Sequence, residues 1–284
     1  MNLRLAVTHL AALSLLLLPL TGGCSGKTAA KTMAWKTLEP GLEFAEFESP
    51  RLDPGPGAKI RVLRADPKLF TVKLLTAAAD AHPRAKTPRQ WVQEASLVAA
   101  INAAMYQADH ITSVSLMKSG AVINNPRVSK DKSVLAFDPV DSTVPPLQII
   151  DRDHQDFETL RRKYSSLVQS IRMLSLDGQN VWEQQLHNRW SIAAVGIDKR
   201  GRILFIHSRS PNTVHDLIDM LLTLPLDLKN AMYTEGGPEA QMFVKSGTVE
   251  YELTGALDAG LQEGFADQPW PIPNVLGLSR KSAP

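Results

Sequence analysis

The chain has 284 residues, 44% of them hydrophobic and 21% charged, and a formal net charge of +2. These proportions are ordinary for a globular protein and argue against a disordered chain. The nearly balanced charge includes no long basic run, which argues against a nucleic-acid partner because phosphate binding requires clustered cations.

The N-terminus has the pattern of an export signal that ends at a cysteine. Arg4 supplies positive charge, an apolar stretch extends from Leu5 to Leu20, and small residues lead to Cys24. This stretch is short for a membrane-spanning helix and has the flanks of a signal peptide. Small residues before a cysteine resemble a bacterial lipobox, although Thr21 stands where leucine is usual. The resemblance implies that Cys24 is lipidated and becomes the mature N-terminus.

Two segments therefore precede the folded part of the protein. We expect residues 1–23 to be a lipoprotein signal peptide and residues 24–34 to be a tether without regular structure. Acyl chains on Cys24 would anchor the protein to a membrane of the bacterial cell envelope, facing the periplasm. An ordinary signal cleaved nearby is the alternative. Because Cys24 is the single cysteine, we expect no internal disulfide and no cysteine nucleophile in the folded part.

The remaining residues, 35–284, are predicted to form one domain of the α/β (α+β) class, with a mixed β-sheet core and helices packed on it. Alternating or continuous apolar runs predict strands near residues 42–47, 59–64, 70–74, 97–101, 113–117, 121–123, 133–137, 168–174, 192–197, 203–206 and 231–234. The tail from Asp267 is rich in proline, and we expect it to be irregular.

Three helices are predicted between these strands. A capping-box pattern at Thr87 predicts the first helix start, and residues 154–164 have an amphipathic pattern. Residues 213–223 carry the clearest helical periodicity of the chain, and this helix begins at either Ser210 or Thr213.

The clearest helix lies between two predicted strands, residues 203–208 and 231–234, as in a βαβ unit. If these strands are parallel neighbours, His207, Ser208 and Glu235 emerge at the same edge of the sheet. This geometric inference places several polar side chains together.

The second of these strands ends in Glu235, Gly236 and Gly237. Glycines allow the backbone to turn and a ligand to approach closely, and the carboxyl end of a strand is a common place for a site. Glu235 could act there as a general acid, as a base, or as a carboxylate that stabilises a cationic transition state. A hairpin turn with a solvated acid is the alternative interpretation.

Several other apolar runs also stop at, or lie beside, polar residues, which suggests an edge where hydrogen-bonding groups converge. The candidate substrate-binding residues are Asn102, Gln169, Arg172, Arg189, Ser208, Arg209, Gly236 and Gly237. Guanidinium groups bind phosphate or carboxylate in a bidentate manner, and an amide can bind a sugar hydroxyl. The alternatives are a surface ion pair for each arginine and a turn-forming role for Asn102.

Two other kinds of site find little support in the residues. His207 and Ser208 are neighbours in a strand, so their side chains point to opposite faces and cannot form a nucleophile–base pair. The histidines are scattered without the spacing of metal ligands, so we predict no zinc site. We predict no cofactor, and nothing in the sequence supports a divalent cation.

Taken in order, the polar motifs resemble those of the exported bacterial branch of the phosphodiester glycosidase family. That family includes the lysosomal enzyme that removes N-acetylglucosamine from a phosphodiester on mannose. The resemblance covers about residues 35–250. The motifs that carry it lie at residues 35–41, 101–106, 113–124, 169–174, 188–196, 205–208 and 235–237.

The resemblance implies a phosphodiester-glycosidase-like fold and a hydrolase that acts on a glycosyl phosphodiester or a related cell-envelope glycan. A carbohydrate or sugar-phosphate ligand and a membrane contact through the lipid anchor are then expected. The chain differs from the family at Ala103 and Ala104, where glycines are usual, at Arg172, where proline is usual, and at Glu235, where aspartate is usual. The alternative is a catalytically inactive envelope lipoprotein that binds a glycan or a protein partner.

Overall fold

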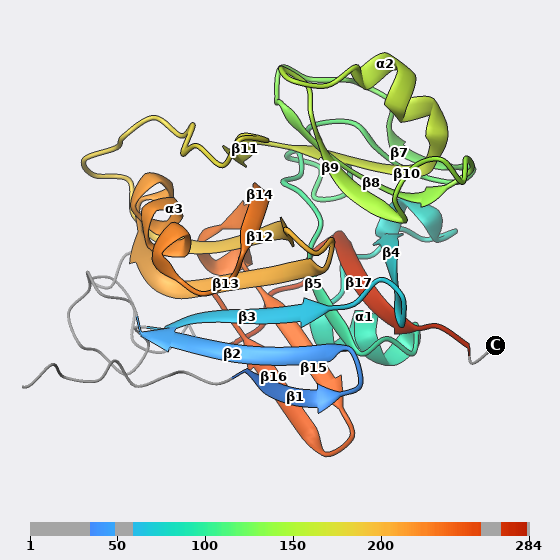
Figure 1. Cartoon of the computed structure of the whole chain (residues 1–284). Coiled ribbons are helices and arrows are strands. Elements are labelled where there is room, and N and C mark those ends of the chain that lie inside the picture. The colour runs from blue at the N-terminus through green and yellow to red at the C-terminus, as the bar shows by residue number, and fades with distance from the viewer. Residues whose placement is uncertain (1–34, 49–58, 257–267, 283–284) are drawn as a thin grey trace, which may run out of the picture. The chain divides into compact units, whose positions relative to one another are not determined.

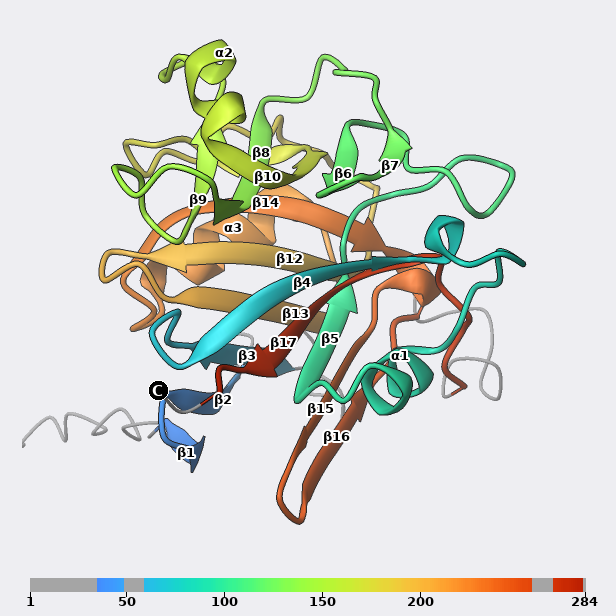
Figure 2. The same cartoon turned by 90° about the vertical axis from the view of Figure 1, so that its right-hand side faces the viewer.

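The computed structural model describes residues 35–48, 59–256 and 268–282, all of which belong to the unit of residues 33–284. Figures 1 and 2 show that β-sheets dominate this unit. The predicted signal peptide, the tether and Cys24 lie outside the described residues. No helix among the described residues is long and apolar enough to cross a membrane.

Three sheets make up the unit. Sheet A has seven strands in the order β1 (Lys36–Glu39), β2 (Leu42–Glu48), β3 (Lys59–Ala65), β13 (Ile203–Asn212), β12 (Trp190–Asp198), β14 (Leu228–Gly236), β11 (Arg172–Leu174). Sheet B has five strands in the order β16 (Val249–Leu253), β15 (Met242–Ser246), β5 (Ala99–Asn102), β17 (Asn274–Arg280), β4 (Phe70–Thr76). Sheet C has five strands in the order β7 (Val122–Asn125), β6 (Met117–Ser119), β10 (Tyr164–Ser170), β8 (Ser133–Pro139), β9 (Leu147–Asp151).

Short helices connect and cover these sheets. The α-helices are α1 (Pro88–Glu94), α2 (Phe157–Leu160) and α3 (Val214–Thr223), and the 3₁₀ turns are η1 (Ala77–Ala79), η2 (Arg161–Lys163) and η3 (Gly237–Glu239). The capping box of α1 is present, since the Thr87 side chain accepts from the Gln90 backbone N–H and the Gln90 side chain accepts from the Thr87 N–H. For α3 the structure selects Thr213, whose hydroxyl accepts from the Asp216 N–H at 3.0 Å.

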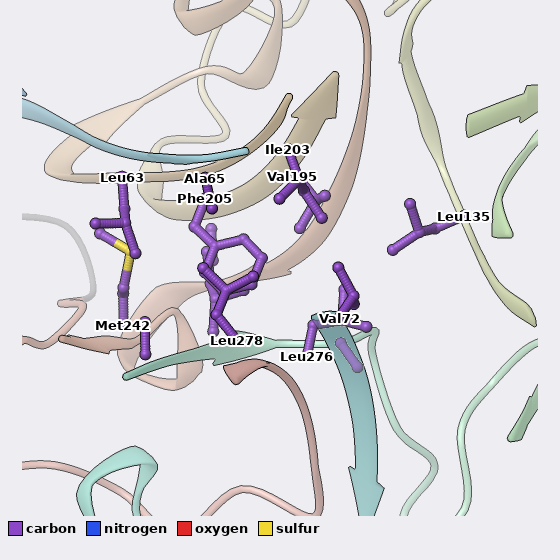
Figure 3. Packing of buried hydrophobic residues seen from close by; sticks show 14 of the residues in the cluster. Leu63, Ala65, Val72, Leu135, Val195, Ile203, Phe205, Met242, Leu276 and Leu278 are labelled. Atoms are coloured by element: carbon purple, nitrogen blue, oxygen red, sulfur yellow. The ribbon is translucent and has the colours of Figure 1, made fainter. Parts of the chain in front are cut away.

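The main hydrophobic core lies where sheet A faces sheet B. Figure 3 shows Leu63 and Phe205 of sheet A meeting Met242 and Leu278 of sheet B. Leu135 of sheet C adds to the same cluster. The opposite face of sheet A is covered by α3, whose apolar stripe packs on β12 and β13. Sheet A is therefore buried on both faces, which fixes the register of its central strands.

The predicted class is confirmed, because the fold combines β-sheets with flanking helices. The pairing differs from the expected mixture, because every neighbouring pair of strands among the described residues is antiparallel. Residues 203–208 and 231–234, considered as possible parallel neighbours, run in the same direction but are not neighbours. β12 lies between them and pairs with both, and β3 pairs with the other edge of β13.

Two further expectations differ from the structure. The tail is not irregular throughout, since β17 occupies a central place in sheet B between β5 and β4 (Figure 2). The amphipathic segment 154–164 is helical only over α2 and the η2 turn, and Tyr164 already belongs to β10. The strands β1, β9, β15 and β16 were not among the predicted ones.

Candidate functional site

Glu235 lies at the end of β14, beside an irregularity in the pairing of that strand. Ala193 of β12 pairs with Glu235 and the next residue, Ala194, pairs with Tyr233, so Thr234 is the extra residue of a bulge. A bulge bends the strand and re-aims the side chains that follow. One Glu235 carboxyl oxygen accepts a hydrogen bond from the Gly236 N–H at 3.0 Å.

The surroundings of Glu235 favour its neutral form. Burial raises the pKa of this carboxyl to about 8, the Gly236 N–H opposes that rise, and the negative charge of Glu239 adds to it. Part of the residue still reaches solvent, so substrate or water has access to it. At neutral pH Glu235 therefore carries a proton that it can donate.

Two tyrosines respond to the same pair of carboxyl groups. Burial and the negative charges of Glu235 and Glu239 raise the pKa of both Tyr106 and Tyr233. Both phenols thus remain neutral hydrogen-bond donors at physiological pH. Tyr106 follows β5 by four residues, so it reaches this place from a distant part of the sequence.

Gly236 allows two aromatic side chains to pack against the backbone beside Glu235. A Cβ atom at Gly236 would overlap the Tyr233 hydroxyl and lie 2.5 Å from the Trp190 indole nitrogen. Trp182 adds a third ring, with its centroid 5.4 Å from that of Tyr233. Trp182 and Trp190 are both partly exposed. Aromatic faces next to a carboxyl group suit the binding of a partly apolar ring such as a sugar.

Gly237 permits the chain to reverse after Glu235. Its φ is +65°, a conformation that side-chain-bearing residues rarely adopt. It opens the η3 turn, which the Ala240 N–H closes by donating to the Gly237 carbonyl at 3.1 Å. The turn carries Glu239 and leads directly into β15.

Asn102 is buried at the end of β5 and binds this turn. Its side-chain amide donates to the Glu239 carbonyl at 2.7 Å, and its side-chain oxygen accepts from the Gln241 N–H at 2.8 Å. Its hydrogen bonds are therefore made to backbone 137 and 139 residues away, and not to its own local turn, which is the alternative interpretation of this residue.

Two of the predicted residues bind groups of sheet C and its loops. The Gln169 side chain is fully buried and binds the backbone of Ser129 and Asp131. Arg172 pairs with Asp151 at 2.5 Å and with Asp153 at 3.0 Å. Both side chains thus bind other parts of the protein, and the Arg172 Nε is buried without a hydrogen-bond partner among the described residues.

The predicted residues on sheet A have different surroundings. Ser208 is fully buried, accepts from the Asn212 side chain at 3.0 Å and pairs with Ile192, which in turn pairs with Gly236. Arg209 is partly exposed and donates to the Thr254 hydroxyl at 3.2 Å. Arg189 is exposed and immediately precedes Trp190.

The structure thus brings Asn102, Gly236 and Gly237 together with Glu235, while Gln169 and Arg172 are occupied elsewhere. The roles assigned to these residues stay predictions. Sequence reasoning missed Tyr106, Tyr233 and Glu239, which interact electrostatically with Glu235, and Trp190, which lies against Gly236. Only Glu239 carried a local signal, as a second acid four residues after the first. Among the described residues, no cluster of three or more histidine, cysteine or acidic side chains could hold a metal ion.

Comparison with known families gives the class of the protein. The phosphodiester glycosidase family matches residues 95–279, most of the chain. The chain belongs to the phosphodiester glycosidase family. A search of curated proteins finds no match.

Solved structures agree with this assignment at the level of the fold. The catalytic domain of zebrafish N-acetylglucosamine-1-phosphodiester alpha-N-acetylglucosaminidase, auto-inhibited by its pro-peptide, is similar with a TM-score of 0.62 at 14% identity. That match covers 86% of this chain and 85% of the zebrafish domain. A hypothetical protein from Synechocystis is similar with a TM-score of 0.56 at 11% identity, over 88% of this chain and 64% of the other.

Proposed function

We propose that the protein is an exported, lipid-anchored enzyme that hydrolyses a glycosyl phosphodiester or a related cell-envelope glycan. The observation that carries the proposal is the neutral, partly accessible carboxyl group of Glu235 in a chain of the phosphodiester glycosidase family. Export and anchoring rest on the sequence pattern that ends at Cys24.

Glu235 supplies a proton in this reaction. Cleavage separates the anomeric carbon from a phosphate oxygen, and that oxygen gains negative charge as the bond breaks. The second pKa of a phosphate monoester is about 6, below the pKa of about 8 of Glu235, so Glu235 assists by hydrogen bonding and partial proton transfer as negative charge develops on the departing oxygen. The buried surroundings then favour the return of a proton to Glu235, which prepares the site for another cycle.

The remaining side chains provide binding. Trp190 and Trp182 present partly exposed rings near Glu235 by way of Gly236 and Tyr233, and these rings can hold a sugar face. Arg189, exposed and next to Trp190, is the best placed of the predicted arginines to meet a phosphate group. The ion pairs of Arg172 with Asp151 and Asp153 make it less suited to that role.

The test is sugar release by the purified protein. A panel of sugar phosphodiesters should include an N-acetylglucosamine-1-phosphodiester, the substrate type named for the zebrafish relative. We expect release by the wild type and a loss of 10²-fold or more in Glu235→Gln, as is usual for removal of a general acid. Glu183→Gln, at an exposed glutamate in the loop before Trp190, is the matched control. Equal release by wild type and Glu235→Gln would remove Glu235 from the mechanism.

A binding protein without turnover is the second candidate. It is favoured by the contacts of Asn102 with the protein backbone and by the ion pairs of Arg172 with Asp151 and Asp153. Calorimetric titration with the same panel separates the two functions, because a binding protein retains the intact phosphodiester while the enzyme releases sugar.

A further inference from the structure

We propose that Glu239 is the second carboxylate of the reaction, which takes the proton from the attacking water, and that Asn102 and His207 are positioning residues that fix the turn bearing it. The proposal rests on the hydrolytic function proposed above. It names a general base, Glu239, in addition to the general acid Glu235. It also gives Asn102 the role of binding the protein backbone instead of the substrate.

The fold places Glu239 across the η3 turn from Glu235. Glu235 precedes the turn and Glu239 is its last residue, so the chain reversal at Gly237 keeps both acids on one short loop. The charge of Glu239 adds to the raised pKa of Glu235, and both charges add to the raised pKa of Tyr106, as expected for two acids that flank one short turn. Glu239 is partly exposed, and its carboxylate has no hydrogen bond or ion pair to any residue that the structure describes.

A pair of buried side chains holds the backbone at and after Glu239. Asn102 donates to the carbonyl of Glu239 and accepts from the N–H of Gln241, at 2.7 and 2.8 Å. His207 lies 3.1 Å from the carbonyl of Ala240 through Nε2. A carbonyl only accepts, so Nε2 carries the hydrogen and donates it.

The two side chains that make these hydrogen bonds belong to different sheets. Asn102 ends β5 of sheet B, whereas His207 belongs to β13 of sheet A, and both are at most 2% exposed. Hydrogen bonds to three successive residues from two rigid elements leave the turn little freedom. Such support is what a reacting group needs in order to keep its geometry without a hydrogen bond of its own.

The other side of the turn is packed against backbone. A Cβ atom at Gly255 would overlap the Gly237 carbonyl oxygen and lie 2.8 Å from the Ala240 carbonyl oxygen, so the chain at Gly255 lies directly against the turn. The Gln241 side chain binds the backbone of Trp270, with its amide donating at 2.9 Å and its oxygen accepting at 3.1 Å. The turn is thereby packed on this side, while Pro238 and Glu239 remain partly exposed.

The reaction then balances with water as the second reactant. The bond from the anomeric carbon to the phosphate oxygen breaks, and neutral Glu235 gives its proton to that oxygen. Water bonds to the anomeric carbon and gives one proton to the Glu239 carboxylate. The products are the free sugar and a phosphate monoester, and exchange with solvent returns the proton from Glu239 to Glu235.

The first test removes the Glu239 carboxylate by substitution and supplies azide as a nucleophile in place of water. We expect Glu239→Gln to lower kcat by 10²- to 10⁴-fold and to abolish the acidic limb of the pH–rate profile. Sodium azide, an anion that needs no deprotonation, should restore turnover and give a glycosyl azide detectable by mass spectrometry. The Glu183→Gln control should keep wild-type kcat and show no azide product. Wild-type kcat in Glu239→Gln would overturn the proposal.

The second test concerns the positioning residues. Asn102→Asp keeps the acceptor for the Gln241 N–H and loses the donor to the Glu239 carbonyl. We expect it to lower kcat by about 10-fold or more with little change in KM, and to shift the acidic limb. His207→Gln retains a side-chain N–H donor and should keep more activity than His207→Ala. A loss of thermal stability in Asn102→Asp, without a change in kcat or pH profile, would assign Asn102 to the fold alone.

A third measurement separates this proposal from the function on which it depends. If the wild type releases no sugar from any phosphodiester, the proposed function fails. The pairing of the two acids is then still decided by carbon-13 NMR titration of the glutamate carboxyl groups. Glu239→Gln should lower the pKa of Glu235, and an unchanged Glu235 titration would show that Glu239 is too distant to act with it.

Discussion

His207 and Glu235 stand in one row across sheet A, because both pair with Ala193 of the strand between them. Neighbouring strands lie about 4.8 Å apart, so the two backbones are about 10 Å from each other. Paired residues of antiparallel strands share a face, which directs both side chains toward the side where the η3 turn lies. This row links a buried histidine to the acid of the candidate site.

Glu235 should set the upper pH limit of activity. Its folded-state pKa of about 8 means that the proton donor is present below that pH and lost above it. We expect kcat/KM to fall tenfold per pH unit above about 8, and Glu235→Gln to remove this limb together with most of the activity. The check is a pH–rate profile between pH 5 and 10, and a wild-type profile that stays flat through pH 9 would contradict the assignment.

His207 should make the protein sensitive to acid. Burial lowers its pKa from 6.5 to about 4, so the unfolded chain binds the proton more readily than the folded protein between these values. The contribution to stability is complete above pH 6.5 and is lost as the pH falls towards 4. Urea unfolding at several pH values should show a decline that is smaller in His207→Gln by on the order of 3 kcal/mol. The exposed His187, changed to Gln, serves as the control and should leave the decline unaltered.

Arg172 should prove to be a stabilising residue. It neutralises Asp151, whose side chain is 2% exposed, so Arg172→Ala leaves a buried carboxylate without its arginine and with only His154 and two backbone N–H groups as partners in the described part of the chain. We expect a loss of about 3–5 kcal/mol in the free energy of unfolding, measured with urea. Arg189→Ala removes an exposed arginine and should leave stability within about 0.5 kcal/mol. A stable Arg172→Ala protein with a raised KM would support phosphate binding by Arg172 instead.

Gly236 should not tolerate a methyl group. Alanine there collides with the Tyr233 hydroxyl and approaches Trp190 to 2.5 Å, so the aromatic rings beside Glu235 must move. We expect Gly236→Ala to lose about 1–3 kcal/mol of stability, as other overpacked sites do, and to lower activity as well. Adding Tyr233→Phe removes the closest atom, and thermal unfolding of the double variant should show partial recovery.

Cys24 should determine where the protein resides. Cys24→Ser removes the acceptor of the lipid, so the variant should move from the membrane fraction of the producing bacterium to the soluble fraction. Mass spectrometry of the mature wild type should show acyl chains on its first residue. Thr21→Leu, which supplies the usual lipobox leucine, should remain in the membrane fraction. Membrane association of Cys24→Ser would show that another part of the chain makes the contact.

Local signals in the sequence predicted the helices and most strands, but not how distant strands pair. The cap at Thr87 and the periodicity of residues 213–223 depend on neighbours within a few residues, and both helices form as expected. The position of β14 depends on which strand edges are free. The turn at Gly201 pairs β12 with β13, and β3 pairs with the other edge of β13, so β14 pairs with the free edge of β12. That competition between edges is not visible in any single segment.

In the candidate site, too, the residues with a local signal could be predicted and those brought in from distant segments could not. Glu235, Gly236 and Gly237 mark a strand end in the sequence itself, and the structure places the neutral acid there. Tyr106 comes from more than one hundred residues earlier, and only the packing of sheets A and B brings it near. The role of Asn102 also depends on a partner 137 residues away, the backbone of Glu239.

Because β17 lies between β5 and β4, sheet B can be completed only after the C-terminal residues have been synthesised. β4 and β5, which are made early during synthesis, have no bridge between them until residues 274–280 have left the ribosome. Until then β4 has no paired edge and β5 has only its edge to β15 paired. Truncation before residue 274 should accordingly give an aggregating protein rather than a smaller active one.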